Sequence, residues 1–328
     1  MPAELRRAEL RAAGLRRAFA DDVRDYLQRR PRQLPSKYFY DALGSSLFEA
    51  ICLLPWYRIT RAESALLERH AREMLEPLTR PLTLAELGCG SGDKLALLAT
   101  RASERFQSIQ LVDISPAALY AARRRVETLR AGPVVLHPAT YEQGLTQLAG
   151  VRREGAMLVL FLGSNLGNFD PGPAREMLTR IRAALQPGDA LLLGTDLVKP
   201  ERELLLAYDD PLQVTAAFNR NLLQRVNTEL GGTFDLDTWS HRAVWNAEAG
   251  RVEMHLVSRV EQPVRIAAID LEILFEEGES IWTESSYKDT AHGWTRRLEQ
   301  AGFETVAQWI DGGDAFALSL ARRADRVT

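Results

Sequence analysis

Short apolar runs and segments of helical periodicity alternate along the middle of the chain. The apolar runs are typical of strands that are buried on both faces of a sheet. They lie at 82–87, 108–113, 133–137, 156–163 and 189–194. A helical pattern follows Asp170-Pro171, with Met177, Leu178, Ile181 and Leu185 on one side. Strands that alternate with helices predict an α/β fold with a doubly wound, Rossmann-like sheet.

The pattern changes before and after this alternation. Residues 3–30 predict an amphipathic helix, and residues 62–74 predict another. Beyond Asp196, helical segments at about 201–208 and 212–230 precede alternating β patterns. In these patterns one face holds Val252, Met254 and Leu256, and another holds Ile269, Leu271 and Ile273. The pattern beyond Asp196 therefore predicts an inserted α+β unit.

The alternating fold resumes near the end of the chain. A helix is predicted from His292 to Ala301, and strands are predicted at 305–310 and 315–320. The two strands are separated by Gly312-Gly313, and such a short turn makes them antiparallel neighbours.

A glycine-rich loop, Glu86-Leu-Gly-Cys-Gly-Ser-Gly-Asp-Lys94, connects the first strand to a helix. Glycines allow tight turns and a close approach of the backbone to a ligand. The dinucleotide fingerprint requires a glycine three residues after its second one, but Asp93 stands three residues after Gly90. The loop resembles motif I of the S-adenosylmethionine-dependent methyltransferases. Asp113, at the end of the next strand, is placed to accept hydrogen bonds from ribose hydroxyls.

Composition narrows the class of protein. The 328 residues are 46% hydrophobic and 26% charged, which is typical of a globular protein, and the net charge of −3 argues against a general nucleic-acid binder. Two cysteines and five histidines show no disulfide or metal-ligand spacing, so we expect no metal. The N-terminus lacks the unbroken apolar core of a signal peptide, and no stretch approaches the ~18 apolar residues of a membrane span. We therefore expect a cytoplasmic protein with no membrane partner, and the oligomeric state stays open, with a monomer as one option.

Four further segments resemble the histidine Nα-methyltransferase family of ergothioneine biosynthesis. They are Leu54-Pro-Trp-Tyr-Arg-Ile-Thr-Arg61, Phe161-Leu-Gly-Ser-Asn-Leu-Gly-Asn168, Leu193-Gly-Thr-Asp-Leu-Val-Lys199 and Ile281-Trp-Thr-Glu-Ser-Ser-Tyr-Lys288. The resemblance implies stepwise transfer of methyl groups from S-adenosylmethionine to L-histidine, which gives the Nα-trimethyl betaine hercynine, the first step of ergothioneine biosynthesis. It also implies a methyltransferase domain (61–195 and 289–328) and a discontinuous substrate-binding domain (1–60 and 196–288).

The resemblance assigns roles to individual residues. For the cofactor it implies Glu86, Gly88, Gly90, Gly92, Lys94, Asp113, Thr140 and Tyr141. For histidine it implies Tyr57, Glu284 and Ser286 at the imidazole, Asn168 and Tyr208 at the α-amino and α-carboxylate groups, and Tyr40, Phe48 and Met254 along the pocket. Thr140-Tyr141 departs from the Asp-Phe that the family leads us to expect at the adenine edge, and a threonine lacks the charge assistance of a carboxylate.

The chemistry of these residues fits the implied reaction. Glu284 and Ser286 are two residues apart on a predicted strand, so they point to the same side and can pair with the two imidazole nitrogens. Asn168 would hold the amine during catalysis, and Tyr40 or Tyr208 could relay its proton to water. Phe48, Tyr40 and Tyr208 could face the quaternary ammonium of the product.

Other classes of protein remain open from the residues alone. An Nα-methyltransferase for tryptophan or tyrosine would use the same scaffold, although an indole or phenol would leave Glu284 or Ser286 unpaired. A non-catalytic nucleoside-binding protein and a nicotinamide-dependent oxidoreductase are the further alternatives. Asn168, Tyr208 and Tyr57 have no evident use in a protein that only binds a nucleoside.

Overall fold

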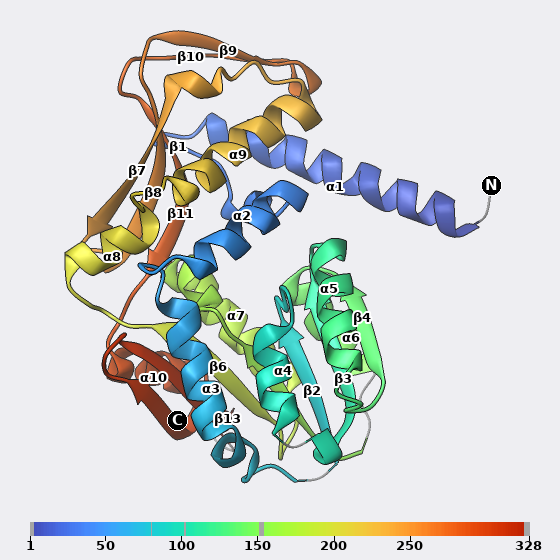
Figure 1. Ribbon diagram of the computed structural model, residues 1–328. Coiled ribbons are helices and arrows are strands. Elements are labelled where there is room, and N and C mark those ends of the chain that lie inside the picture. Colours follow the sequence, from blue (N-terminus) through green and yellow to red (C-terminus); the bar gives the residue numbers. More distant parts are fainter. Residues whose placement is uncertain (1–2, 80, 102, 151–153, 325–328) are drawn as a thin grey trace. The chain divides into compact units, whose positions relative to one another are not determined.

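The computed structural model describes residues 3–79, 81–101, 103–150 and 154–324. Contacts between Cα atoms divide the chain into two compact units. Unit 1 contains residues 1–56 and 201–285, and unit 2 contains residues 57–200 and 286–328. Each unit is thus built from two separate stretches of chain, as the colours of Figure 1 make visible.

Unit 2 is built on a mixed sheet that, among the described residues, has seven strands in the order β12-β13-β6-β5-β2-β3-β4. The strands β2, β3, β4, β5 and β6 are parallel to their neighbours, whereas β13 is antiparallel to both β6 and β12. The bounds are β2 Leu82–Leu87, β3 Phe106–Asp113, β4 Val134–Pro138, β5 Ala156–Phe161, β6 Ala190–Asp196, β12 Phe303–Asp311 and β13 Phe316–Arg323. Every residue of β2, β5 and β6 is buried, as the continuous apolar runs predict.

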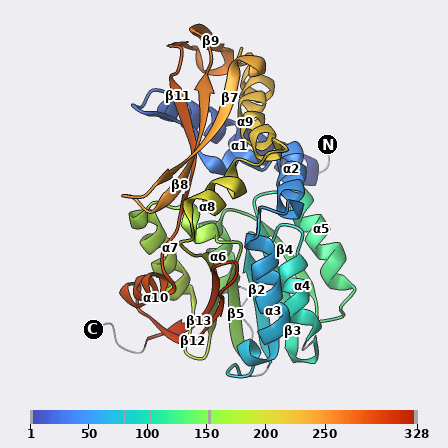
Figure 2. The same ribbon diagram turned by 60° about the vertical axis from the view of Figure 1, so that its left-hand side comes forward.

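Helices cover both faces of this sheet. On one face α3, α4 and α5 lie beside one another, and on the other α6 packs on α7 and α7 on α10 (Figures 1 and 2). The bounds are α3 Ile59–Leu75, α4 Asp93–Thr100, α5 Pro116–Glu127, α6 Tyr141–Gly150, α7 Pro171–Ala184 and α10 Ala291–Gln300, with short 3₁₀ turns at Ser103–Arg105 and Asn165–Asn168. The α/β fold and the doubly wound sheet with an antiparallel end are thereby confirmed.

Unit 1 combines helices with two small sheets. Its helices are α1 Ala3–Leu27, α2 Ala42–Leu53, α8 Glu201–Tyr208 and α9 Val214–Leu230, with 3₁₀ turns at Ser36–Phe39, Leu236–Thr238 and Ala267–Ile269. One sheet has the order β1-β11-β8-β7 (β1 Arg32–Gln33, β7 Trp239–Asn246, β8 Arg251–Ser258, β11 Ser280–Tyr287). The other is the antiparallel pair β9 Gln262–Ile266 and β10 Leu271–Phe275.

One predicted strand face in unit 1 is correct in only two of its three residues. Val252, Met254 and Leu256 do form a buried face of β8. Ile269, however, ends a 3₁₀ turn, and Asp270 adopts a left-handed conformation (φ 47°) before β10 begins. The chain turns there, so Leu271 and Ile273 share a face of β10 with Phe275 and not with Ile269. An apolar residue at the right spacing does not reveal such a turn.

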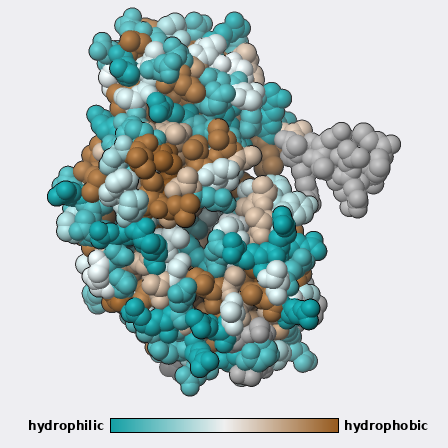
Figure 3. Space-filling view, in the orientation of Figure 1, coloured by the Kyte–Doolittle hydropathy of each residue, from teal (hydrophilic) through white to brown (hydrophobic). Residues whose placement is uncertain are grey.

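The surface is mixed in character. Figure 3 shows hydrophobic side chains distributed among hydrophilic ones on both units. In unit 1 the exposed apolar side chains include Leu43 and Leu53 of α2 and Leu212 ahead of α9. Among the described residues, no helix has both the length and the apolar character needed to span a membrane.

Candidate active site

The glycine loop is fastened to the end of the neighbouring strand. Gly88, Gly90 and Gly92 all have positive φ angles, of 74°, 49° and 76°. The backbone N–H of Gly90 donates to Oδ2 of Asp113 at 3.0 Å, and the N–H of Gly88 donates to the carbonyl of Val112 at 2.8 Å. These bonds hold the loop at the carboxyl ends of β2 and β3, which is where ligands bind in open α/β sheets.

Gly88 is closely packed, so that a side chain at this position would crowd its neighbours. A Cβ atom at this position would lie 3.0 Å from the Tyr141 hydroxyl and 3.2 Å from Nδ2 of Asn165. The loop, the start of α6 and the end of β5 therefore meet here within unit 2. Gly88 lets these three segments pack closely, because it has no Cβ and adopts a positive φ angle.

Asp113 carries out two tasks at the end of β3. Its Oδ1 accepts from the backbone N–H of Ser115 at 2.8 Å, and its Oδ2 accepts from Gly90. Burial raises the pKa of Asp113, although these N–H bonds act in the opposite direction. A carboxylate oxygen can accept more than one hydrogen bond, so the residue can hold the loop and still accept from ribose hydroxyls.

Glu86 is an unusual acid at the end of β2. Its side chain is only 2% exposed, and its Oε2 finds no hydrogen-bond partner among the described residues. Burial raises the pKa of Glu86 well above its usual range, and the neighbouring acids Glu63 and Asp113 raise it further while Lys94 lowers it. A buried acceptor with no partner is costly, and a cationic or N–H-bearing ligand would relieve it. The buried acid therefore suits a ligand with an ammonium group.

We predict that Glu86→Gln stabilises the ligand-free protein more at pH 8 than at pH 5. In the wild type the folded state keeps the Glu86 proton above the usual carboxyl pKa of about 4.3, so the free energy of unfolding falls as pH rises towards the raised pKa. Glutamine has no proton to lose. The difference in melting temperature between variant and wild type should therefore grow from pH 5 to pH 8. A constant difference would show that Glu86 is ionised throughout.

Lys94 is held by a buried acid that the sequence did not single out. Glu63 of α3 is fully buried, and its Oε2 lies 2.5 Å from Nζ of Lys94. Both carboxylate oxygens of Glu63 also accept from the N–H of Gly163 at 2.9 Å. The pair therefore joins α3, α4 and the end of β5 at the edge of the sheet. Glu63 was not predicted as a site residue, because it stands among charged residues of an amphipathic helix, where an acid usually faces solvent.

Thr140 and Tyr141 have local structural roles. The Thr140 hydroxyl accepts from the N–H of Gln143 at 3.4 Å, and the Gln143 side chain accepts from the N–H of Thr140 at 3.5 Å. This reciprocal pair is a capping box at the start of α6. The Tyr141 ring packs edge-on against Phe161, with centroids 5.2 Å apart. The Tyr141 hydroxyl lies beside Gly88, and the capping role of Thr140 was not predicted.

A second group in unit 2 surrounds Asn168 and Ser286. Gly167 allows the Ser164–Asn168 loop to approach the chain closely, because a Cβ there would lie 2.9 Å from the carbonyl of Tyr287. Ser286 is 3% exposed and its Oγ accepts from Nζ of Lys288 at 2.9 Å. Tyr57, which precedes α3, is 8% exposed and belongs to the same unit. Unit 2 thus holds the predicted cofactor residues together with Tyr57, Asn168 and Ser286.

Unit 1 holds the other predicted substrate residues. The ring of Tyr40 lies edge-on to those of Phe48 (5.6 Å) and Phe218 (5.8 Å), so Tyr40 and Phe48 belong to one aromatic group. Phe218 of α9 is a member that the sequence analysis missed. Met254 is buried in β8, and Glu284 lies on β11.

Tyr208 is the last residue of α8 and is 8% exposed. Its carbonyl accepts from Nε2 of His241 at 2.7 Å, while Nδ1 of His241 accepts from the Asn219 amide at 2.8 Å. Because that amide nitrogen also lies 3.2 Å from the carbonyl of His255, it must be the donor, and His241 is neutral. Burial lowers the pKa of His241, in agreement with this arrangement. The histidine thus fixes the end of α8, a role that its isolated position in the sequence did not indicate.

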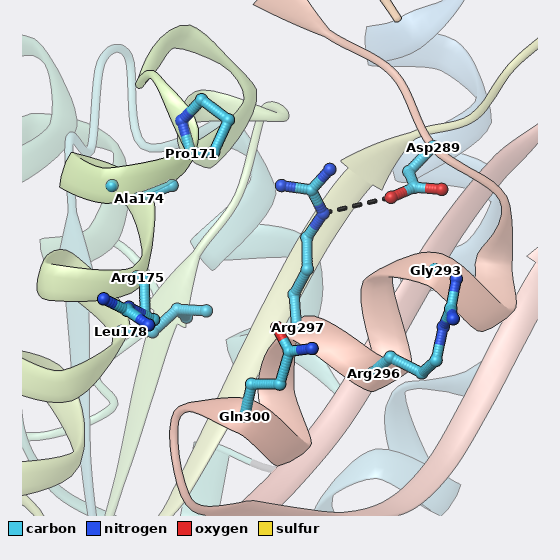
Figure 4. A pocket seen from close by; sticks show the side chains of 10 residues that line it. Pro171, Ala174, Arg175, Leu178, Asp289, Gly293, Arg296, Arg297 and Gln300 are labelled. Atoms are coloured by element: carbon cyan, nitrogen blue, oxygen red, sulfur yellow. Dashed lines mark hydrogen bonds and ion pairs between the residues drawn. The ribbon is translucent and has the colours of Figure 1, made fainter.

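A cavity of about 470 Å³ lies elsewhere in unit 2, between α7 and α10 (Figure 4). Its lining includes Arg175, Arg296 and Arg297, and Arg297 extends to Asp289, with Nε 3.0 Å from Oδ2. None of the predicted site residues lines it. Its arginines would repel the sulfonium and ammonium groups of S-adenosylmethionine. Across the described residues, no group of three or more His, Cys, Asp or Glu side chains could hold a metal ion.

Comparison with known proteins gives consistent matches. The family model of histidine-specific, S-adenosylmethionine-dependent methyltransferases matches residues 19–323. The histidine N-alpha-methyltransferase of Mycolicibacterium smegmatis is 41% identical over 96% of this chain and 97% of that protein. The protein of the same name from Mycobacterium tuberculosis is 39% identical over 93% and 95%. Ergothioneine biosynthesis protein 1 of Schizosaccharomyces pombe is 28% identical over 84% of this chain and 37% of that protein.

Proposed function

Since the chain belongs to the histidine-specific, S-adenosylmethionine-dependent methyltransferases, we propose that it methylates the α-amino group of L-histidine. The product would be the trimethyl betaine hercynine, formed stepwise as the first step of ergothioneine biosynthesis. The observation that carries this proposal is the 41% identity to a histidine N-alpha-methyltransferase over nearly the whole of both chains. The left-handed glycines of the loop and the buried Oε2 of Glu86, which has no partner among the described residues, support it.

We assign the cofactor to the edge of the sheet in unit 2. Asp113 would accept from the ribose hydroxyls, and Gly88, Gly90 and Gly92 would let the backbone approach the ligand. Glu86 would accept from the ammonium group, Lys94 would face the carboxylate, and Thr140 and Tyr141 would border the adenine. When bound, S-adenosylmethionine supplies a methyl group activated by its sulfonium.

The protein's own contribution to the reaction is to orient the substrate and exclude water. Asn168 and Tyr208 would hold the amino and carboxylate groups so that the nitrogen lone pair points at the methyl carbon. Orientation of this kind is worth ~7–11 kcal/mol of the barrier. No strong base is needed, because α-amino groups titrate within a few units of neutrality. The aromatic group of Tyr40 and Phe48 would face the cationic product.

The amine must still lose a proton before each transfer, and we propose Tyr40 or Tyr208 as the relay to water. Tyr→Phe at the responsible position should lower kcat and remove one limb of the pH–rate profile, with little change in cofactor affinity. Substitutions of Met254 or Phe218, which have no group that can carry a proton, are not expected to change the pH–rate profile. An unaltered profile in both single variants would dismiss the relay.

Histidine selection is the property that separates this proposal from the alternative of another aromatic amino acid. Glu284 and Ser286 would each satisfy one ring nitrogen, and a site of buried hydrogen-bond partners rejects substrates that lack them. The test is turnover of histidine, tryptophan and tyrosine side by side, with mass spectrometry of the products. Preferential methylation of histidine supports the proposal. A preference for tryptophan or tyrosine would refute it and favour the alternative substrate.

A further inference from the structure

Lys288 is buried directly beside one of the proposed specificity residues. Its side chain is fully buried, and its Nζ lies 2.9 Å from Oδ2 of Asp196 and 2.9 Å from Oγ of Ser286. The other oxygen of Asp196 accepts from Nζ of Lys199 at 2.7 Å, and that carboxylate is 2% exposed. A buried ammonium is stable only when it is paired, and Asp196 supplies that pairing. Lys288 is therefore held firmly against Ser286.

The backbone makes this arrangement rigid. Leu197, just after β6, forms a parallel bridge with Asp289, and the N–H of Val198 donates to the carbonyl of Asp289 at 3.1 Å. The N–H of Asp196 donates to Oγ of Ser164 at 3.0 Å. The segment after β11 is thus tied to the end of β6 and to the loop that leads to Asn168.

The bond between Lys288 and Ser286 has a fixed polarity. An ammonium has no lone pair, so Lys288 donates and the Ser286 oxygen accepts. The hydroxyl has one proton, which must then be directed away from Lys288. A serine hydroxyl can usually rotate so that it either donates to a partner or accepts from it. Here the oxygen already accepts from Lys288, which fixes the side from which it accepts.

We propose that Lys288 is a positioning residue that makes Ser286 a donor to the bare ring nitrogen of bound histidine. The inference rests on the proposed function, in which Glu284 and Ser286 hold the imidazole. An ionised Glu284 can only accept, so it takes the ring N–H, and Ser286 donates to the other nitrogen. Glu284, Ser286 and Lys288 alternate along one strand and its extension, which places them towards one side. The pair therefore selects the neutral imidazole in one tautomer, since an imidazolium would point a second N–H at a donor.

A double-mutant cycle tests this dependence. Ser286→Ala and Lys288→Met should each weaken histidine binding about tenfold, the effect of one lost hydrogen bond, and the double variant should also lose about tenfold. Affinity is measured by calorimetry in the presence of S-adenosylhomocysteine. Lys288→Arg keeps a cation that only donates, so it should stay within about threefold of the wild type. Independent losses that multiply to about 100-fold in the double variant would overturn the proposal.

A second measurement needs no substitution and applies if Lys288→Met does not fold. Ring-labelled ¹⁵N histidine bound to the wild type at pH 7 should show one protonated and one unprotonated ring nitrogen. Two protonated nitrogens would overturn the proposal. If the wild type binds no histidine at all, the proposed function itself fails, and this result is distinct from either outcome of the labelling experiment.

Discussion

Replacing Asp113 with alanine is expected to weaken S-adenosylmethionine binding by about 100-fold or more. Hydrogen bonds to a charged group contribute ~1.5–3 kcal/mol each, and the variant loses those to the ribose as well as the bond that holds Gly90. The effect should appear in the dissociation constant measured by calorimetry, with both S-adenosylmethionine and S-adenosylhomocysteine.

Asp113→Asn is the matched control for this effect. Asparagine keeps the shape and one acceptor oxygen, but its amide N–H₂ would face the backbone N–H of Gly90 or of Ser115. An intermediate loss is therefore expected. If the alanine variant folds and its affinity stays within about threefold of the wild type, the cofactor assignment to this edge of the sheet is wrong.

Replacing Glu284 with alanine is expected to weaken histidine binding by about 100-fold while cofactor binding stays unchanged. The variant leaves a ring N–H without its charged acceptor, which costs ~2–3 kcal/mol when the group is buried. Glu284 belongs to unit 1, whereas the proposed cofactor residues belong to unit 2. The two affinities should therefore separate cleanly in titrations with each ligand.

Glu284→Gln distinguishes charge from shape at the same position. Glutamine keeps an acceptor oxygen but not the charge, so the loss should be about tenfold. Equal weakening of histidine and cofactor binding in the alanine variant would show a general disturbance of the fold and refute the assigned role.

Most strands and helices of unit 2 could be predicted because they have an apolar run or a clear helical face. The helix predicted from His292 to Ala301 illustrates the accuracy of such local signals, since α10 spans Ala291–Gln300. The helix α6 was not predicted, because the capping box of Thr140 and Gln143 stands in a segment with few apolar residues. The turn at Asp270 was missed for a different reason, because its left-handed conformation is set by the fold around it.

The candidate site was only partly visible in the sequence. The glycine loop and Asp113 carry local signals, and the substrate residues were assigned through resemblance. Glu63 and His241 could not be found in this way, because each acts through a partner far away in the sequence, and the ion pair that holds Lys288 against Ser286 is with the distant Asp196. Glu63 meets Lys94 and Gly163, and His241 meets the carbonyl of Tyr208. Only the folded chain brings such partners together.

The most direct test of the account is the identity of the methylated nitrogen. The purified protein is incubated with L-histidine and S-adenosylmethionine that carries a ¹³C-labelled methyl group, and the product is analysed by NMR and tandem mass spectrometry. The account predicts labelled methyl groups on the α-nitrogen, accumulating to the trimethyl betaine, with an unmodified ring. A methyl group on an imidazole nitrogen, or no transfer to histidine, would contradict it.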